Sequence, residues 1–218
     1  MAEPSSETIT QKPRIPMLKH APQTTEETRR SLKWRVVDIA VGAAVGVMSG
    51  VMFWVFDGMS YGLFPLLTLI LPGSAALLHA LFYFPATLGL LIVHKPGASA
   101  YVLLVASFVE VVLGTKYSVS LVVIALVQAL AAETVFAVFR YRRWTLGVTL
   151  LSSVAIGIVY NFYLLFFYYQ AFSFFSPRGL IGTACELLSA AVFAGFGSWG
   201  LYRALAKSGV LARFSSGQ

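Results

Sequence analysis

Charged residues and cysteine are scarce in this sequence. Asp, Glu, Lys and Arg make up 11% of the 218 residues, whereas hydrophobic residues make up 58%. A soluble domain carries about 25% charged residues, so the composition excludes a water-solvated globule and, over most of the chain, intrinsic disorder. The one cysteine, Cys185, has no partner for an internal disulfide and lies in an apolar run, which is typical of a small core residue. The sequence predicts an integral membrane protein.

Short motifs for nucleotide, metal and redox chemistry are also missing. There is no Gly-rich Walker loop, so the chain cannot hydrolyse ATP on its own, and no HExxH or Cys-x-x-Cys pattern. His79 and His94 have no second His, Cys or carboxylate at metal-ligand spacing. We expect neither an enzyme nor a bound metal or cofactor. The net charge of +7 does not indicate nucleic-acid binding, because the basic residues lie where a membrane protein would carry them.

Long apolar stretches recur along the chain. A transmembrane helix needs about 20 apolar residues, and this length predicts an all-α membrane protein with six transmembrane helices. The expected spans cover residues 36–56, 74–93, 98–113, 119–139, 146–170 and 179–202.

The distribution of Lys and Arg predicts the orientation, because these residues gather on cytoplasmic loops. All of them except Lys116 and Arg178 lie in the N-terminal segment, the turns at Lys95 and 140–143, or the C-terminal end. Both termini are then cytoplasmic. We expect a flexible polar tail over residues 1–33, a membrane domain over 34–204 and a C-terminal tail over 205–218.

Two segments remain on the outer side. Residues 57–73 are apolar but contain glycine and proline, and we interpret them as a lid over a cavity, with a half-inserted helix as the alternative. Residues 172–178 form a second outer loop, whose aromatic rings are also typical of an interfacial belt.

The carboxylates of Glu110, Glu133 and Glu186 lie well inside the expected spans. A charged side chain near the bilayer centre costs about 2.5 to 3.5 kcal/mol on insertion scales and is by default a functional candidate. The spans contain no Lys or Arg to pair with them, so a cationic ligand or protonation is the natural compensation. Glu133 lies deeper than the other two, and a structural pair with Arg140 is an equal alternative for it.

Further polar and aromatic residues share the outer half of the membrane with Glu110 and Glu186. Gln128 and Asn161 lie there, although such residues can also hydrogen-bond between helices. Tyr160 and Trp54 are candidate walls for a flat ring. Carboxylates beside aromatic walls suit a planar, cationic heterocycle.

Small residues repeat every four positions in the first span. Such a ridge lets another helix approach closely. Packing within the chain and docking onto another membrane subunit are both open interpretations of the ridge, which consists of Ala40, Gly42, Ala44, Gly46 and Gly50.

Several segments resemble the YkoE family, the substrate-binding (S) components of energy-coupling factor (ECF) transporters assigned to thiamine and its hydroxymethylpyrimidine precursor. The similar segments are 94–98 (His-Lys-Pro-Gly-Ala), 109–114, 127–136, 176–179 and 204–211. The resemblance implies six helices with both ends inside, an outward-facing vitamin pocket under loop lids, and docking of the first helix onto a transmembrane T subunit driven by two ATPase subunits.

The chain departs from the family pattern at several positions. Leu103 stands where the family has a second acid, Ala129 and Ala131 replace glycines, and Asn161 stands where an acid often follows the tyrosine. Glu186 is an additional acid that can replace the missing charge from another helix.

The leading hypothesis is an S component that binds thiamine or hydroxymethylpyrimidine. Its polar contacts would be Glu110, Gln128, Glu133, Asn161 and Glu186, and Trp54 and Tyr160 would pack on the ring. The alternatives are a membrane scaffold without a small ligand and a proton-coupled permease that titrates Glu133 or Glu186.

Overall fold

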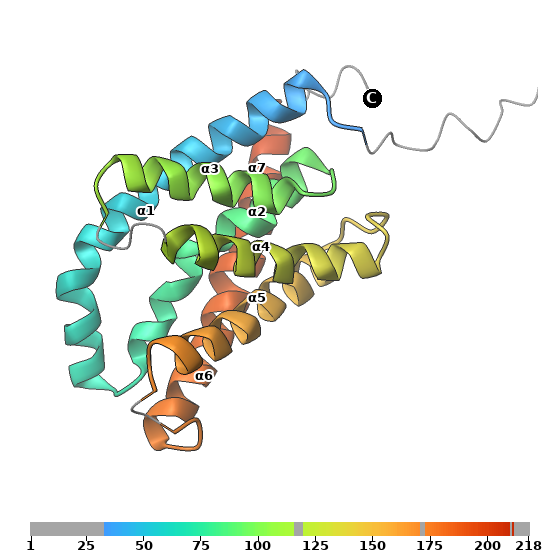
Figure 1. Cartoon of the computed structure of the whole chain (residues 1–218). Helices are drawn as coiled ribbons and strands as arrows, with labels where there is room; N and C mark the ends of the chain where they lie inside the picture. The colour runs from blue at the N-terminus through green and yellow to red at the C-terminus, as the bar shows by residue number, and fades with distance from the viewer. Residues whose placement is uncertain (1–32, 116–119, 171–172, 210, 212–218) are drawn as a thin grey trace, which may run out of the picture. The chain divides into compact units, whose positions relative to one another are not determined.

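The computed structural model of the chain describes residues 33–115, 120–170, 173–209 and 211. Within these ranges the regular structure is helical and no strand occurs, as the all-α prediction expects (Figure 1). The expected N-terminal tail, apart from Lys33, lies outside the described residues. In chain order the elements are α1 (Val36–Ile70), the 3₁₀-helix η1 (Ser74–Phe82), α2 (Phe84–Val93), α3 (Ala98–Val112), α4 (Ser120–Val138), α5 (Leu146–Phe167), α6 (Pro177–Ser189), the π-helix η2 (Ala190–Gly197) and α7 (Ser198–Lys207).

Each expected span coincides with a helical segment of the described chain. Five segments are long and apolar enough to cross a membrane, and two of them, Ser74–Val93 and Pro177–Lys207, join consecutive helices. The remaining one, α3, is a shorter apolar helix of 15 residues. The last segment continues past the expected end at residue 202, and α5 ends before the expected residue 170.

The predicted lid over residues 57–73 is not an irregular loop. α1 is helical without interruption from Val36 to Ile70 and contains Pro65. In Figure 1 the helix changes direction where its colour passes from blue to cyan. An apolar segment at membrane depth is stabilised by pairing its N–H and C=O groups internally, and a helix does this where an open loop does not. Residues 57–70 are therefore helical, and only residues 71–73 lie between α1 and η1.

The second segment, η1 with α2, is the central element of the bundle. In its most apolar stretch of 18 residues, 67% is buried inside the protein, whereas the value is 28% to 33% for the other four long segments. Residues Tyr83, Ala86, Leu90 and Leu91 are fully buried. The segment contacts α1, α3, α4, α5, α6, α7 and η2, so its side chains reach every part of the bundle.

The glycines of the first helix pack within the chain. A Cβ added at Gly46 would lie 2.7 Å from Cβ of Val105, and one at Gly50 would lie 2.5 Å from the carbonyl oxygen of Ala106. Gly42, Gly46 and Gly50 therefore allow α1 to approach α3 closely, which favours packing within the chain for this half of the ridge. Ala40 and Ala44 lie on a different face of α1 and are exposed.

Polar contacts join the last helical segment to α2. The hydroxyl of Thr87 donates to the carbonyl oxygen of Ala194 at 2.9 Å, and the hydroxyl of Ser198 donates to the carbonyl oxygen of Phe84 at 3.0 Å. Ala194 lies in the π-helix η2. These bonds hold the C-terminal segment on the central helix.

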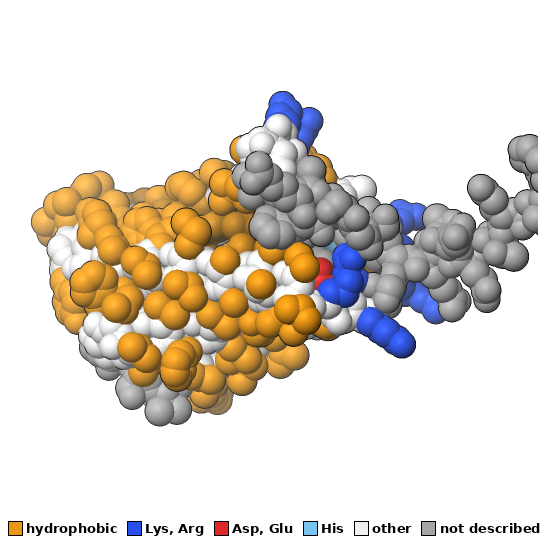
Figure 2. Space-filling model, turned by 90° about the horizontal axis from the view of Figure 1, so that it is seen from above, with side chains coloured by type: hydrophobic (Ala, Val, Ile, Leu, Met, Phe, Trp, Pro, Cys, Tyr) orange, Lys and Arg blue, Asp and Glu red, His pale blue; other side chains and the backbone are white. Residues whose placement is uncertain are grey.

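The surface of the bundle is largely apolar. Figure 2 shows hydrophobic side chains over most of one face, with Lys and Arg gathered toward one end. Large exposed side chains include Met48, Leu69, Phe108, Leu130 and Phe166. Such a surface is stable in lipid and would aggregate in water.

Candidate functional site

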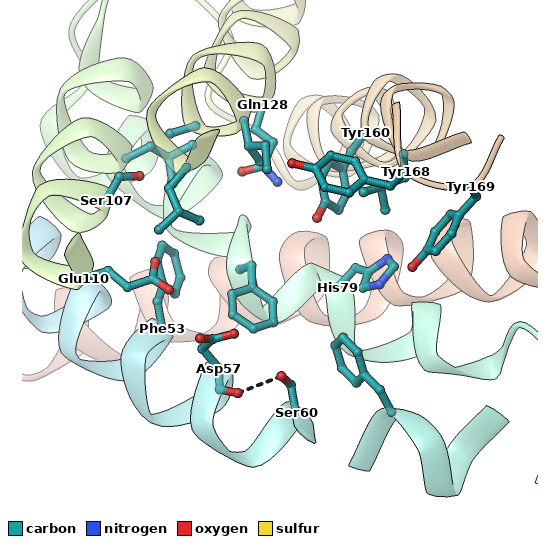
Figure 3. A pocket seen from close by; sticks show the side chains of 17 residues that line it. Phe53, Asp57, Ser60, His79, Ser107, Glu110, Gln128, Tyr160, Tyr168 and Tyr169 are labelled. Carbon is teal, nitrogen blue, oxygen red and sulfur yellow. Dashed lines mark hydrogen bonds between the residues drawn. The ribbon is translucent and has the colours of Figure 1, made fainter. Parts of the chain in front are cut away.

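A cavity of about 230 Å³ lies among α1, η1, α3, α4 and α5 (Figure 3). Aromatic rings form much of its wall, with Phe53 and Phe64 on α1, Phe82 on η1 and Tyr160 on α5. Its polar lining consists of Asp57, Ser60, His79, Ser107, Glu110, Gln128, Tyr160, Tyr168 and Tyr169. This combination of rings and a few polar groups is typical of a small-molecule site.

Two carboxyl groups meet in the cavity. Glu110 of α3 is 2% exposed, and Asp57 of α1 is also buried. Figure 3 shows both side chains directed toward the same part of the cavity. The hydroxyl of Thr115 donates to Oδ2 of Asp57 at 3.4 Å. No Lys or Arg lines this cavity among the residues that the structure describes, so this part of the wall is suited to a cationic group.

Gln128 brings an available hydrogen-bond donor from α4. Its side chain is 2% exposed and projects toward the cavity in Figure 3. The Nε2 atom has no hydrogen-bond partner within the described part of the chain. A buried polar group without a partner costs about 1 to 3 kcal/mol, which a ligand acceptor would recover.

The motif Gly58-Met59-Ser60-Tyr61-Gly62 has the spacing of a hydrolase nucleophile. In that class the serine lies on a sharp turn between a strand and a helix. Here Ser60 lies inside α1, and its hydroxyl donates to the carbonyl oxygen of Asp57 at 2.7 Å. The local structure gives Ser60 no nucleophilic geometry.

Glu186 lies behind the cavity wall. It is fully buried, and Oε2 lies 2.5 Å from Nδ1 of His79 in a hydrogen bond. Oε1 accepts a bond of 2.8 Å from the hydroxyl of Tyr83. Glu186 itself lines neither this cavity nor the next, and it reaches the cavity through the ring of His79, which packs edge-on against Tyr160.

A second cavity of about 350 Å³ lies among the C-terminal half of α1, η1, α5 and the start of α6. Asn161 and Arg178 line it. The Asn161 amide donates to the hydroxyl of Thr183 on α6 at 2.9 Å, which joins α5 to α6. The sequence prediction grouped Asn161 with Glu110, and the structure separates them into adjoining cavities.

Glu133 lies away from both cavities, near the Lys95 turn. Oε1 accepts the backbone N–H of Ser99 at 3.0 Å, in the first turn of α3, and Oε2 accepts the hydroxyl of Tyr141 at 2.5 Å. A carboxylate at a helix N-terminus stabilises the helix. Burial, together with the adjacent Glu133 carboxylate, raises the pKa of Tyr141 above its ordinary value. These contacts replace the pair with Arg140 that the sequence suggested.

Trp54 is not part of the cavity wall. It is 44% exposed on the outer surface of α1, whereas its neighbour Phe53 is buried and lines the cavity. Adjacent helical positions face about 100° apart, so only one of the two can face inward.

Sequence reasoning missed several lining residues, including Asp57, Ser60 and His79. Phe53, Asp57, Ser60 and Phe64 recur every three to four positions on one face of α1. This helical period was a usable signal. The glycines and Pro65 concealed it, because they predicted a loop. His79 stood alone in the sequence, and its partner Glu186 is brought to it only by the packing of η1 on α6.

These features define a membrane protein with a small-molecule site: an apolar helical bundle that encloses a cavity lined by acids and aromatic rings. The sequence matches, over residues 37–159, the family described as ABC-type cobalt transport system, permease component, and the chain belongs to this family.

Two relatives cover most of the chain. A Bacillus subtilis (strain 168) protein that carries the name HMP/thiamine permease protein YkoE is 25% identical over 189 residues, which are 85% of this chain and 91% of that protein. A crystal structure of an S-component of an ECF transporter superposes with a TM-score of 0.75 at 26% identity, covering 85% of this chain and 92% of the other. The chain is an S component of an ECF transporter and not an enzyme.

Proposed function

We propose that this chain captures thiamine, or its hydroxymethylpyrimidine precursor, in the cavity lined by Asp57 and Glu110, and delivers it through a T subunit driven by two ATPase subunits. The single observation that carries the substrate class is the pair of buried carboxyl groups beside aromatic rings. The name of the Bacillus subtilis relative supports the choice of vitamin.

The chemistry of thiamine matches this lining. It joins a thiazolium cation to an aminopyrimidine, and both rings are flat. Asp57 and Glu110 compensate the positive charge in a setting of low dielectric, where such pairing is strong. Phe53, Phe82 and Tyr160 supply faces for the rings. Gln128 donates to a ring nitrogen through its Nε2 atom, which has no hydrogen-bond partner among the described residues.

The remaining predicted contacts take indirect roles in this proposal. Glu186 acts by holding His79, and Asn161 lies in the adjoining cavity. Glu133 stabilises the first turn of α3. Trp54 faces lipid at the edge of the site.

The proposed orientation has six crossings with both termini in the cytoplasm. Apart from Arg178, the described Lys and Arg residues cluster at the end of the bundle near Lys33, the Lys95 turn, the 140–143 turn and Lys207, the pattern of a cytoplasmic side (Figure 2). The carboxyl-lined cavity then opens outward. For the T subunit we propose the exposed Ala40 and Ala44 as the contact, since the glycines of the ridge already pack on α3.

Isothermal titration calorimetry of the detergent-purified protein tests the proposal, with thiamine, hydroxymethylpyrimidine and riboflavin as ligands. We expect saturable binding of thiamine or the pyrimidine and none of riboflavin. Glu110→Gln should weaken thiamine about 10- to 100-fold, because a hydrogen bond to a charged group is worth about 1.5 to 3 kcal/mol. Phe108→Leu, an exposed position on the same helix, is the control and should bind normally. Binding of riboflavin alone would reject thiamine and hydroxymethylpyrimidine as the substrate. Binding of none of the three ligands would favour a membrane scaffold.

A further inference from the structure

The two cavities adjoin each other. Four side chains, Phe64, His79, Leu164 and Tyr169, line both of them and form a shared wall. One of the four, His79, is held from behind by the fully buried Glu186. The wall therefore has a fixed polar member, and a ligand that extends past it would enter the second cavity.

The cavities carry charges of opposite sign. The first is lined by Asp57 and Glu110. The second is lined by Arg178, and within the described residues no Asp or Glu lines it. Arg178 lies in the first turn of α6, where the helix macrodipole also favours negative charge. One of the adjoining cavities thus has an acidic lining and the other a basic lining.

The backbone around Arg178 is fixed by close packing. Gly73, with φ of 99°, lies where an added Cβ would be 2.8 Å from the Arg178 carbonyl oxygen and 2.8 Å from the Gly182 nitrogen. Only glycine combines this left-handed conformation with so close an approach. On the opposite side, Asn161 is hydrogen-bonded to Thr183 of α6. The start of α6 is held by both neighbours, so the basic end is preformed.

We propose that the second cavity is an anion subsite, and that the two cavities together bind a heterocyclic cation that carries a phosphate monoester. The binding of the cationic ring in the first cavity rests on the proposed function. The anion subsite extends the substrate class to the phosphorylated vitamin. The ring lies between Asp57, Glu110 and the aromatic wall. The alkyl linker passes the shared wall at His79 and Tyr169, and the phosphate lies near Arg178, where a guanidinium can form two parallel hydrogen bonds to it.

Calorimetry of the full-length protein with thiamine, thiamine monophosphate and inorganic phosphate tests this inference. We expect the wild type to bind the monophosphate at least as tightly as thiamine. Arg178→Gln should weaken the monophosphate tenfold or more and change thiamine by less than twofold, and Arg178→Lys should recover part of the loss. Arg142→Gln, at an exposed turn on the opposite end of the bundle, is the charge-matched control and should change neither ligand.

The outcomes separate this inference from the proposed function. If the wild type binds thiamine but binds the monophosphate more than 100-fold more weakly, the anion subsite is overturned and the proposed function stands. Equal weakening of both ligands by Arg178→Gln also overturns it, since that pattern indicates a structural role, which thermal unfolding of the variant would reveal. Binding of neither ligand by the wild type rejects the proposed function and this extension with it.

Discussion

The carboxylate of Glu186 and the ring of His79 form a buried pair, with Oε2 of Glu186 2.5 Å from Nδ1 of His79. The two residues are 107 positions apart in the chain and come from α6 and η1. Tyr83 donates to the other carboxylate oxygen, so each oxygen of Glu186 has a protein partner. The pair ties the wall of the cavities to the C-terminal helical segment.

This pairing predicts that Glu186 contributes to stability more than to direct ligand contact. Glu186→Leu leaves the buried hydroxyl of Tyr83 and Nδ1 of His79 without their partner, which costs about 1 to 3 kcal/mol for each group. We expect a clear loss of thermal stability, measured by nanoscale fluorimetry in detergent. Tyr83→Phe removes one bond only and should show a smaller loss. A Glu186→Leu protein as stable as the wild type would contradict the prediction.

The acid pair predicts charge selectivity. Asp57→Asn and Glu110→Gln should each weaken thiamine about 10- to 100-fold, because each removes a charged partner of the cation. Binding of the neutral hydroxymethylpyrimidine should change less. Calorimetry of each single variant and of the double variant checks this. Since both carboxyl groups face one part of the cavity, the two effects should not simply add. Equal losses for the cationic and neutral ligands would contradict the charge argument.

Gln128 predicts an unusual combination of effects. Its Nε2 atom is buried without a partner within the described ranges, so Gln128→Met, of similar volume, should leave the ligand-free protein as stable as the wild type or more stable. Ligand affinity should fall about 5- to 20-fold for the loss of one hydrogen bond. Thermal unfolding with and without thiamine measures both effects. A variant that loses stability but keeps its affinity would show that the amide has a structural role.

The two kinds of small residue in α1 predict opposite results. Gly50→Ala places a Cβ 2.5 Å from the carbonyl oxygen of Ala106, and we expect a loss of about 1 to 3 kcal/mol in stability. Ala44→Leu adds bulk on an exposed face, so folding and thiamine binding should persist while uptake with the T and ATPase subunits falls. Calorimetry and radiolabelled uptake in vesicles separate the two effects. Full uptake by Ala44→Leu would remove this face from the proposed contact.

Glu133 predicts a structural effect remote from the ligand. Glu133→Leu removes the acceptor of the Ser99 N–H and of the Tyr141 hydroxyl, and should lower stability by about 1 to 3 kcal/mol. Thiamine affinity of the folded fraction should stay within twofold of the wild type. Tyr141→Phe, which removes one of the two bonds, is the graded control. A large loss of affinity without a loss of stability would assign Glu133 to ligand binding.

Sequence patterns predicted the helical class and the helical segments well, because long apolar runs have few alternatives in a bilayer. They also indicated Glu110, Gln128 and Tyr160, which all line the first cavity. They did not show that Asp57 lies opposite Glu110. That arrangement depends on α1 continuing as a helix past Gly58 and Gly62, which local propensity disfavours and the apolar surroundings stabilise.

Residues whose role depends on a distant partner were the least predictable. The sequence suggested a ligand contact for Glu186, because its partner His79 is 107 positions away and no local pattern connects the two residues. The alternation of inward Phe53 and outward Trp54 depends on the rotation of α1 about its axis, which the packing of its glycines on α3 determines.

The length of α1 has a mechanical consequence. At about 1.5 Å per residue, its 35 residues measure about 50 Å along the path of the helix, more than the hydrocarbon thickness of about 30 Å. Ala44 lies near one end and Phe64 near the other, on a single run of hydrogen-bonded turns. Phe64 at the cavity and the exposed Ala44 therefore lie on one continuous but bent helix, about 30 Å apart along its path (Figure 1). In the proposed orientation, a change of this bend would carry filling of the cavity toward the face proposed for the T subunit.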